Sequence, residues 1–277
     1  MTSPFRTVST LLTLFRSLRS VLSLVVPERP HDPRVDELLD RAARAHVVGR
    51  RDEAQALFEE ALTAHPDPGR LAAIHYELGR LDAERGRSAA ALGHFKSALR
   101  ADRTFVPAAL ALGDAQERAG DLREAVRTWE RAAELQPALP VLGRLERVYR
   151  QEGRPRRMIA LYRAAGERAP DDLAIAAALG RVYFELEMLD EAADQFEKIE
   201  VRAPDMPIVH AFLAAVFERR GETREAFDEY RRALRLARGF DWPHACVACG
   251  AREAAWDDRC PRCLRLNTLW PRPIAPA

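Results

Sequence analysis

The sequence is poor in aromatic residues and carries almost no net charge. Phe, Trp and Tyr make up 7% of the 277 residues, and 43 basic residues nearly balance 42 acidic ones, for a net charge of +1. Such a balance produces no global field that would attract nucleic acid or an acidic partner. Ala, Leu, Arg and Glu dominate instead, which favours a helical protein with small residues where helices touch.

Catalytic motifs are missing as well. The seven histidines are scattered along the chain. No glycine-rich loop could cradle a phosphate, and no serine stands in a nucleophile-elbow motif. We therefore expect a protein that is not an enzyme.

Cysteine is absent before Cys246, and all four cysteines lie between Cys246 and Cys263. A disulfide framework would distribute them along the chain, so the clustering favours metal binding in a reducing compartment. After an apolar N-terminal stretch the chain reads Pro27-Glu28-Arg29-Pro30, which is not the small-x-small pattern of a secretory cleavage site. We therefore expect the body of the chain to be cytoplasmic.

A motif recurs six times along the middle of the chain. It consists of Gly, four residues, Ala, three residues, a large aromatic residue, two residues, Ala, four residues and Pro. The first position is held by Gly49, Gly86, Gly120, Gly153, Glu187 and Gly221, and the aromatic position by Phe58, Phe95, Trp129, Tyr162, Phe196 and Tyr230. Arg103 stands in the proline position of the second copy. Pairs such as Leu78-Gly79 and Leu112-Gly113 precede the first position by seven residues.

This pattern is that of the 34-residue tetratricopeptide repeat, here over residues 35–240. Each repeat is a pair of helices. Small residues let the two helices approach closely, the aromatic residue fills the space against the next repeat, and proline ends the second helix. Because one pair cannot bury its apolar stripe alone, neighbouring pairs stack. We predict an all-α fold, a right-handed superhelix of six repeats.

The first helices of the repeats should line a concave face. The register places on it the side chains of Tyr76, Arg80, Asp114, Glu117, Arg147, Arg150, Arg181 and Phe184. Tyr76, Arg80, Arg147, Arg150, Arg181 and Phe184 are our candidate partner-binding residues, because guanidinium groups beside aromatic rings suit a peptide with carboxylates. The alternative is that these are solvated charges of an arginine-rich chain.

Residues 241–277 differ in character, because the helical period stops there. The motif Cys246-x-x-Cys249, followed directly by Gly250, is separated by ten residues from Cys260-Pro261-x-Cys263. Two such knuckles facing each other form a tetrahedral site for one metal ion, with metal–sulfur bonds of about 2.3 Å for zinc. Redox dithiol motifs and free surface thiols are the alternatives, but neither explains two pairs at this spacing.

We predict that Cys246, Cys249, Cys260 and Cys263 ligate one zinc or iron ion, because tetrahedral thiolate suits both metals. Four protein ligands leave no open position, so the ion would be structural or redox-active rather than hydrolytic. The module is short, so we expect metal binding to supply its folding free energy. His244 is expected at the surface or beside the ligands.

Residues 1–27 contain Arg6, Arg16 and Arg19 and no acidic residue. Their apolar residues recur at helical spacing, which predicts a basic amphipathic helix lying at a membrane surface. Arg16 and Arg19 interrupt the apolar run that a membrane-spanning helix needs. A helix docked on the repeats, or an exposed arm, is the alternative.

The order of these modules resembles the lipopolysaccharide assembly protein B (LapB) family of Gram-negative bacteria. The likeness is carried by the two cysteine knuckles, by Trp256 in the gap between them, and by Thr268 and Pro271 after them. The stretches 105–114 and 186–192 of the repeats agree as well. Two departures are a shorter array and an N-terminal segment that is not a clean transmembrane helix.

The resemblance implies an adaptor at the cytoplasmic side of the bacterial inner membrane, peripheral or N-terminally anchored. Its implied partners are an LpxC-like deacetylase, which commits to lipid A synthesis, and an FtsH-like membrane protease that degrades it. The implied role is therefore the control of lipopolysaccharide levels, with a rubredoxin-like metal module at the C-terminus.

Two other functions stay open. One is a general tetratricopeptide co-chaperone or assembly scaffold whose zinc ribbon caps the last repeat, and the other is a rubredoxin-like electron carrier. Nucleic-acid binding, common for zinc ribbons, is disfavoured. From His244 onward five arginines face three acidic residues, which is far from a strongly basic patch.

Overall fold

The computed structural model describes residues 33–236, 244–253 and 256–271. The described residues form twelve helices in six consecutive pairs, which we number as repeats 1 to 6. The pairs are α2 (Pro33–Val47) with α3 (Arg51–Thr63), α4 (Pro68–Glu84) with α5 (Ser88–Ala101), α6 (Val106–Arg118) with α7 (Leu122–Leu135), α8 (Leu139–Gln151) with α9 (Pro155–Arg168), α10 (Leu173–Glu185) with α11 (Leu189–Arg202), and α12 (Pro207–Arg220) with α13 (Thr223–Leu236).

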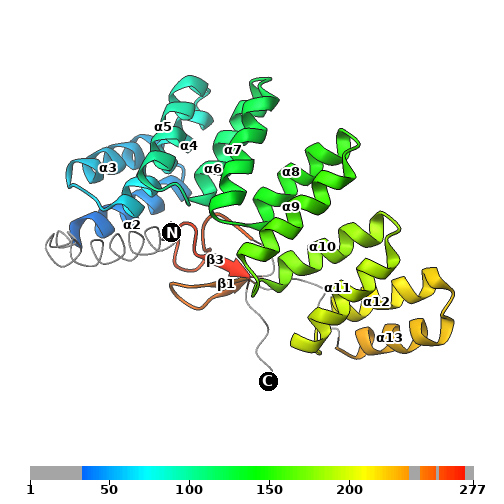
Figure 1. Cartoon of the computed structure of the whole chain (residues 1–277). Helices are drawn as coiled ribbons and strands as arrows, with labels where there is room; N and C mark the ends of the chain where they lie inside the picture. The colour runs from blue at the N-terminus through cyan, green and yellow to red at the C-terminus, as the bar shows by residue number, and fades with distance from the viewer. Residues whose placement is uncertain (1–32, 237–243, 254–255, 272–277) are drawn as a thin grey trace, which may run out of the picture.

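The six pairs stack one after another along a curved array, and the C-terminal strands lie inside the curve (Figure 1). The predicted superhelix of tetratricopeptide repeats is thereby confirmed. The predicted N-terminal amphipathic helix, residues 1–27, lies outside the described residues. No helix in the described part of the chain is long and apolar enough to cross a membrane.

Short polar signals delimit the helices. Asp67 accepts hydrogen bonds from the backbone N–H groups of Gly69 and Arg70 at the start of α4, at 3.0 and 3.1 Å, and such a cap stabilises a helix by about 1 kcal/mol. Between the two helices of each pair, one residue adopts left-handed backbone geometry. It is glycine in five repeats, and Glu187, with φ of 58°, in the fifth.

Glycine in the first helix makes room for the aromatic residue of the second. A Cβ atom on Gly79, Gly113 or Gly180 would lie 2.6, 2.1 or 2.7 Å from the ring of Phe95, Trp129 or Phe196. Each ring is therefore packed against the glycine of its own repeat. The expected contact with the next repeat also exists, since the Phe196 ring stacks on Phe212 of repeat 6 with centroids 4.8 Å apart.

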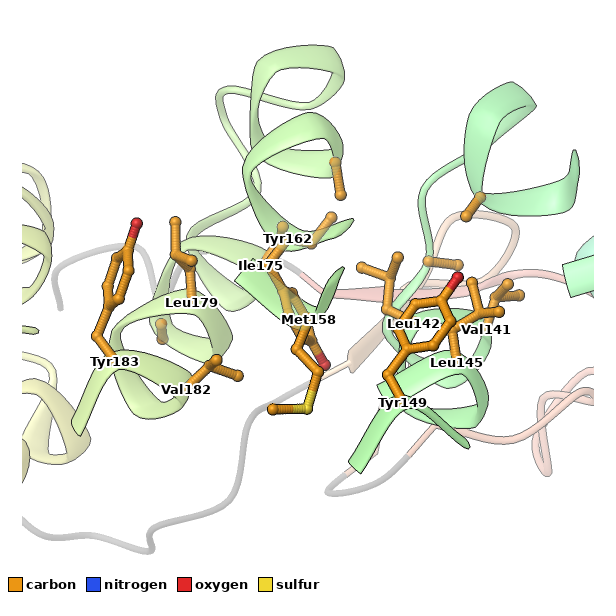
Figure 2. Packing of buried hydrophobic residues seen from close by; sticks show 14 of the residues in the cluster. Val141, Leu142, Leu145, Tyr149, Met158, Tyr162, Ile175, Leu179, Val182 and Tyr183 are labelled. Atoms are coloured by element: carbon orange, nitrogen blue, oxygen red, sulfur yellow. The ribbon is translucent and has the colours of Figure 1, made fainter. Parts of the chain in front are cut away.

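The buried residues of the array form three clusters, the longest of which runs from repeat 3 to repeat 6. Figure 2 shows part of it in repeats 4 and 5, where aliphatic and tyrosine side chains of α8, α9 and α10 interdigitate. Leu142, Leu145 and Ile175 are fully buried there. Each repeat thus completes its core only with its neighbours.

The C-terminal module is a small antiparallel sheet. Its strands are β1 (His244–Cys246), β2 (Arg252–Glu253) and β3 (Leu269–Pro271), in the order β2-β1-β3. Ala245 pairs with Arg252 on one side and with Trp270 on the other. Strands β1 and β2 bracket the first cysteine knuckle, and a separate bridge between Arg259 and Leu266 brackets the second.

Candidate metal centre on the concave face

The two cysteine knuckles have the same backbone geometry. The N–H of Gly250 donates to the carbonyl of Cys246 at 2.8 Å, and the N–H of Leu264 donates to that of Cys260 at 2.8 Å. Gly250 and Leu264 both adopt left-handed geometry, with φ of 72° and 60°. The turn expected at Gly250 is thus present, and Leu264 repeats it at a steric cost of about 1 kcal/mol.

The four sulfur atoms meet at one point. Cys246 Sγ lies 3.6 Å from Cys263 Sγ, and Cys249 Sγ lies 3.7 Å from Cys260 Sγ. All four sulfurs are within 4.8 Å of one another. A tetrahedron with metal–sulfur bonds of about 2.3 Å has sulfur–sulfur edges of about 3.8 Å. The cysteines therefore fit one tetrahedrally bound metal ion.

Hydrogen bonding and burial divide the thiols into unlike groups. Burial opposes ionisation of Cys246, but the Thr268 side chain and the backbone N–H groups of Cys249 and Ala248 outweigh it and lower its pKa to about 6. Thr268 Oγ1 lies 3.2 Å from Cys246 Sγ. Burial, together with the neighbouring thiols, raises the pKa of Cys263 to about 12. A bound cation would favour the thiolate at all four positions.

A second group of possible ligands is already occupied by protein. Glu200, His210 and Glu229 lie close together. However, Arg232 Nη1 bonds to Glu200 at 2.8 Å and to Glu229 at 3.2 Å, and His210 Nδ1 lies 2.6 Å from Glu229. This cluster is therefore an ion-pair network that joins α11, α12 and α13.

The residues just before Cys260 dock the module onto repeat 2. The Tyr76 hydroxyl donates to the Asp258 carboxylate, and Arg80 Nη1 donates to the same oxygen at 3.3 Å. Arg259 Nη2 donates to the Glu77 carboxylate. Its other nitrogen, Nη1, donates to the carbonyl of Leu264 within the module at 2.6 Å. One arginine thus joins the second knuckle to the array.

Apolar contacts extend this docking. Leu266 packs against the buried cluster that contains Tyr76 and Phe105. Trp256 and Trp270 pack against the long core of the later repeats. The module therefore covers part of the concave face, and its polar anchor is repeat 2 rather than the last repeat.

Glu77 is the centre of the docking contact. It is only 1% exposed, and its carboxylate lies 3.2 Å from His46 Nδ1 of repeat 1. Burial works against its ionisation, but the hydrogen bond from His46 and the charge of Arg259 lower its pKa below the ordinary value. This buried carboxylate thereby connects repeat 1, repeat 2 and the module.

The candidate partner-binding residues fall into two sets. Tyr76 and Arg80 contact the module, as described above. Arg147, Arg150 and Arg181 pair with carboxylates of the array, namely Glu117 at 2.7 Å, Glu185 at 2.5 Å and Glu146 at 2.6 Å. Phe184 lies beneath Arg219, whose guanidinium carbon is 4.9 Å from the ring centroid. That these residues bind a partner stays a prediction.

Repeat 4 replaces the close-packed glycine by a carboxylate. Glu146 occupies the position of Gly113 and Gly180, and it accepts a hydrogen bond from the Tyr162 hydroxyl at 2.6 Å. Burial opposes its ionisation, but the hydrogen bonds from Arg181, Tyr162 and Arg150 lower its pKa to about 2. The concave arginines are thus held by a buried charge within their own array.

Several of these residues were not predicted from the sequence. Asp258 and Arg259 look like ordinary surface charges of a loop, and Glu77 like an exposed helical residue. His244 was expected at the surface or beside the ligands, and it is 7% exposed and outside the sulfur cluster. The replacement of glycine by Glu146 was visible in the repeat register and could have indicated the network around it.

Comparison with known proteins agrees with this architecture. Two models described as tetratricopeptide repeat match the chain, one over residues 39–104 and 76–140 and the other over residues 149–216. No curated protein matches the sequence.

Several solved structures are similar to part of the chain. A crystal structure of MamA protein is 20% identical, covers 61% of this chain and 92% of that chain, and has a TM-score of 0.45. MamA 41-end from Desulfovibrio magneticus RS-1 is 20% identical, covers 60% and 94%, and has a TM-score of 0.43. YrrB, described as a TPR protein with an unusual peptide-binding site, is 18% identical, covers 65% and 91%, and has a TM-score of 0.44.

The family follows from the matched repeats, which span more than half of the residues, and from the six stacked helix pairs. The chain belongs to the tetratricopeptide repeat proteins, which are scaffolds for protein–protein interaction.

Proposed function

We propose that this scaffold is an adaptor that presents an LpxC-like deacetylase to an FtsH-like membrane protease at the cytoplasmic side of the inner membrane. The observation that carries the proposal is the docking of the thiolate module on repeat 2 through Arg259 and Glu77. It joins the two modules into one surface, on which two partners can bind side by side. The order of modules supports it through the resemblance to the LapB family.

The part of the concave face that the module leaves open carries ion pairs that a bound client protein can replace. Arg147 and Arg150 are about half-exposed, and the carboxylates with which they pair, Glu117 and Glu185, are about one-third exposed. Exposed pairs of this kind contribute about 0 to 1 kcal/mol. A client carboxylate can therefore replace Glu117 at little cost, whereas Glu185 is held by Arg181 as well.

The thiolate site takes a structural part in this proposal. Cys246, Cys249, Cys260 and Cys263 would hold one zinc or iron ion, and the ion would fix the knuckle that carries Asp258 and Arg259. The docking residues would then be positioned by metal binding. An iron ion would add one-electron chemistry, as a rubredoxin-like carrier needs.

The adaptor role is tested in cells. Deletion of the gene should lengthen the half-life of the deacetylase, and the wild-type gene should restore it. Arg147→Glu combined with Arg150→Glu should fail to restore it, whereas Arg224→Glu, at an exposed position of the last helix, should succeed. An unchanged half-life on deletion would contradict the proposal. Deletion of residues 1–27 should release the protein from isolated membranes.

The general scaffold is the second candidate, because the repeats by themselves bind many kinds of protein. Affinity purification from solubilised membranes separates the two. A protease and an envelope-biosynthesis enzyme among the captured proteins would support the adaptor. Their absence, with chaperones or assembly factors in their place, would favour the general scaffold.

A further inference from the structure

A basic groove lies between the second helices of repeats 2 and 3, outside the docking site of the module. It has a volume of about 560 Å³ and is lined by α5, the loop after it, α6 and α7. Its rim carries Lys96, Arg100, Arg103 and Arg131, and no acidic residue lines it. All four cationic side chains are exposed.

These four cations lack carboxylate partners. Among the residues that the structure describes, none of the four forms a salt bridge, and Arg100 donates only to the Ser97 hydroxyl at 2.8 Å. Most arginines on the concave face are, in contrast, paired with glutamate or aspartate. Four like charges around one groove repel each other, so an anionic ligand would be stabilised there.

The floor of the groove is apolar. Leu99, Leu112 and Leu135 line it together with alanines, and Leu135 is 43% exposed. Covering such a surface stabilises a complex by about 25 cal/mol per Å² of apolar area. The groove thus combines a cationic rim with an apolar base.

The equivalent groove between repeats 4 and 5 is different. It is smaller, at about 370 Å³, and includes Glu167 and Asp172. Its cations are engaged: Arg163 donates to the Tyr183 hydroxyl at 2.6 Å, Lys198 pairs with Asp194 at 2.5 Å, and Arg202 pairs with Asp171 at 2.9 Å. The unpaired cations of the first groove are therefore not a general result of stacking these repeats.

The sequence register sharpens the contrast. Two repeats later, the positions of the four cations are held by other residues. Arg163, Glu167, Pro170 and Lys198 stand there in place of Lys96, Arg100, Arg103 and Arg131. The first groove thus has arginine at two positions, Arg100 and Arg103, where the second groove has Glu167 and Pro170. Arg103 is the residue that replaces the usual proline, although α5 already ends at Ala101.

We propose that this groove binds an acidic, leucine-containing peptide segment of a partner protein. Carboxylates of the segment pair with the rim, and its apolar side chains cover the leucines of the floor, as an amphipathic helix does in a hydrophobic groove. The ends of this chain do not have the right charge, since residues 1–27 and 272–277 contain arginine and no acidic residue. A flat bilayer surface cannot reach the floor between two helices. The proposal does not depend on the adaptor role.

Fluorescence anisotropy tests the proposal with the full-length protein. The probe is a labelled synthetic peptide with glutamates on one helical face and leucines on the other. Lys96→Glu, Arg100→Glu and Arg131→Glu together should raise its dissociation constant at least about tenfold. The matched control, Lys198→Glu at the register of Arg131, should change it less than about twofold. Circular dichroism should show unchanged helicity in both.

The floor is tested separately. Leu135→Ala should weaken binding by about fivefold through lost apolar area, without changing its salt dependence. Leu122→Ala, an exposed leucine at the start of the same helix and outside the groove, should have no effect.

Three results would overturn the proposal. One is equal affinity of the triple variant and the wild type, and another is equal affinity for a peptide with glutamine in place of glutamate. The third is groove-dependent binding of phosphatidylglycerol vesicles without peptide binding, which would assign the groove to a membrane. Binding that weakens with added salt and is lost in the triple variant would support it.

Discussion

In the repeat array the close contact between glycine and an aromatic ring recurs, whereas the thiolate module depends on four sulfur atoms. Glycine meets an aromatic ring in repeats 2, 3 and 5, and loss of one such contact leaves the other two intact. The described part of the module has three short strands and four buried apolar residues, two of which are cysteines. Loss of one contact in the array should therefore cause a partial, local loss of stability, whereas loss of one cysteine should unfold the whole module.

The largest effect is expected from Cys260→Ser. The variant should lose the bound metal, measured as metal per chain, because three thiolates leave the tetrahedral site incomplete. Metal binding of this kind supplies on the order of 10 kcal/mol, so the module should unfold and the fluorescence of Trp256 and Trp270 should change. Far-UV circular dichroism should still show the helices of the array.

The control for this variant is Val247→Ser. Val247 lies in the first knuckle and is 56% exposed, so the metal content should be that of the wild type. Global loss of helix in Cys260→Ser would mean that the array needs the docked module to fold. Elemental analysis and the visible spectrum of the wild type also distinguish zinc from iron.

A smaller effect is expected where the two regions meet. Glu77→Gln leaves Arg259 without its charged partner and removes one of the two carboxylates bonded to His46. Removing one member of a buried ion pair destabilises by about 3 kcal/mol. Urea unfolding followed by circular dichroism measures this, and protease cleavage after α13 should report release of the module. Glu117→Gln, which breaks only the half-exposed pair with Arg147, should cost less than about 1 kcal/mol. Equal losses would contradict a central role of Glu77.

Within the array, Gly113→Ala should be destabilising by about 2 kcal/mol. Its Cβ would lie 2.1 Å from Trp129 Nε1, and overpacking of a core typically costs about 1 to 3 kcal/mol. Gly143→Ala is the matched change, because Gly143 lies in a helix with no atom within 4 Å of its added Cβ. That variant should gain up to about 1 kcal/mol of helix propensity. A neutral Gly113→Ala would show that the glycine–aromatic contact is looser than the structure indicates.

The smallest effect concerns two histidines with opposite surroundings. Hydrogen bonds to Glu77 and Glu84 raise the pKa of His46, against the opposing effect of burial. Its stabilisation is therefore complete below pH 6.5 and is lost as the pH rises through the folded-state value. Burial, followed by the charges of His94 and Arg100, lowers the pKa of His75. Its contribution is lost instead as the pH falls below 6.5.

Urea unfolding of His46→Gln and His75→Gln from pH 5 to 8 measures both. The stability difference between the wild type and His46→Gln should decrease as the pH rises. The corresponding difference for His75→Gln should increase. The same slope for both variants would contradict the assignment of His46 to the interface between repeats 1 and 2.

The repeated and the local features were predictable from the sequence. The period predicted six helix pairs because each repeat must bury the same stripe, and the two Cys-x-x-Cys pairs predicted a four-sulfur cluster because knuckles impose local geometry. Contacts between neighbouring first helices also left a signal. Arg144 pairs with Asp114 and Arg147 with Glu117, in each case 30 residues apart, so an acid followed by arginine at that spacing indicates such a pair.

The docking of the module was not predictable in this way. It joins Glu77 of the periodic repeats to Arg259 of the module, which has no period. No fixed spacing in the sequence therefore relates the two residues. A glutamate between apolar residues of a helix and an arginine beside a cysteine are compatible with many surroundings. Only the superhelical curvature of the array, which results from all six repeats together, brings them into contact.

The docked module also has a mechanical consequence. Tyr76 and Asp258 are 182 positions apart, so their contact ties the tail of the chain to its second repeat across the inside of the curve. A stack of repeats by itself can extend elastically, because each repeat touches only its neighbours. The docked module therefore links the two ends of the curve and limits how far the array can open. Closing so long a loop is slow, so the contact between the module and repeat 2 should form last during folding and break first under mechanical load.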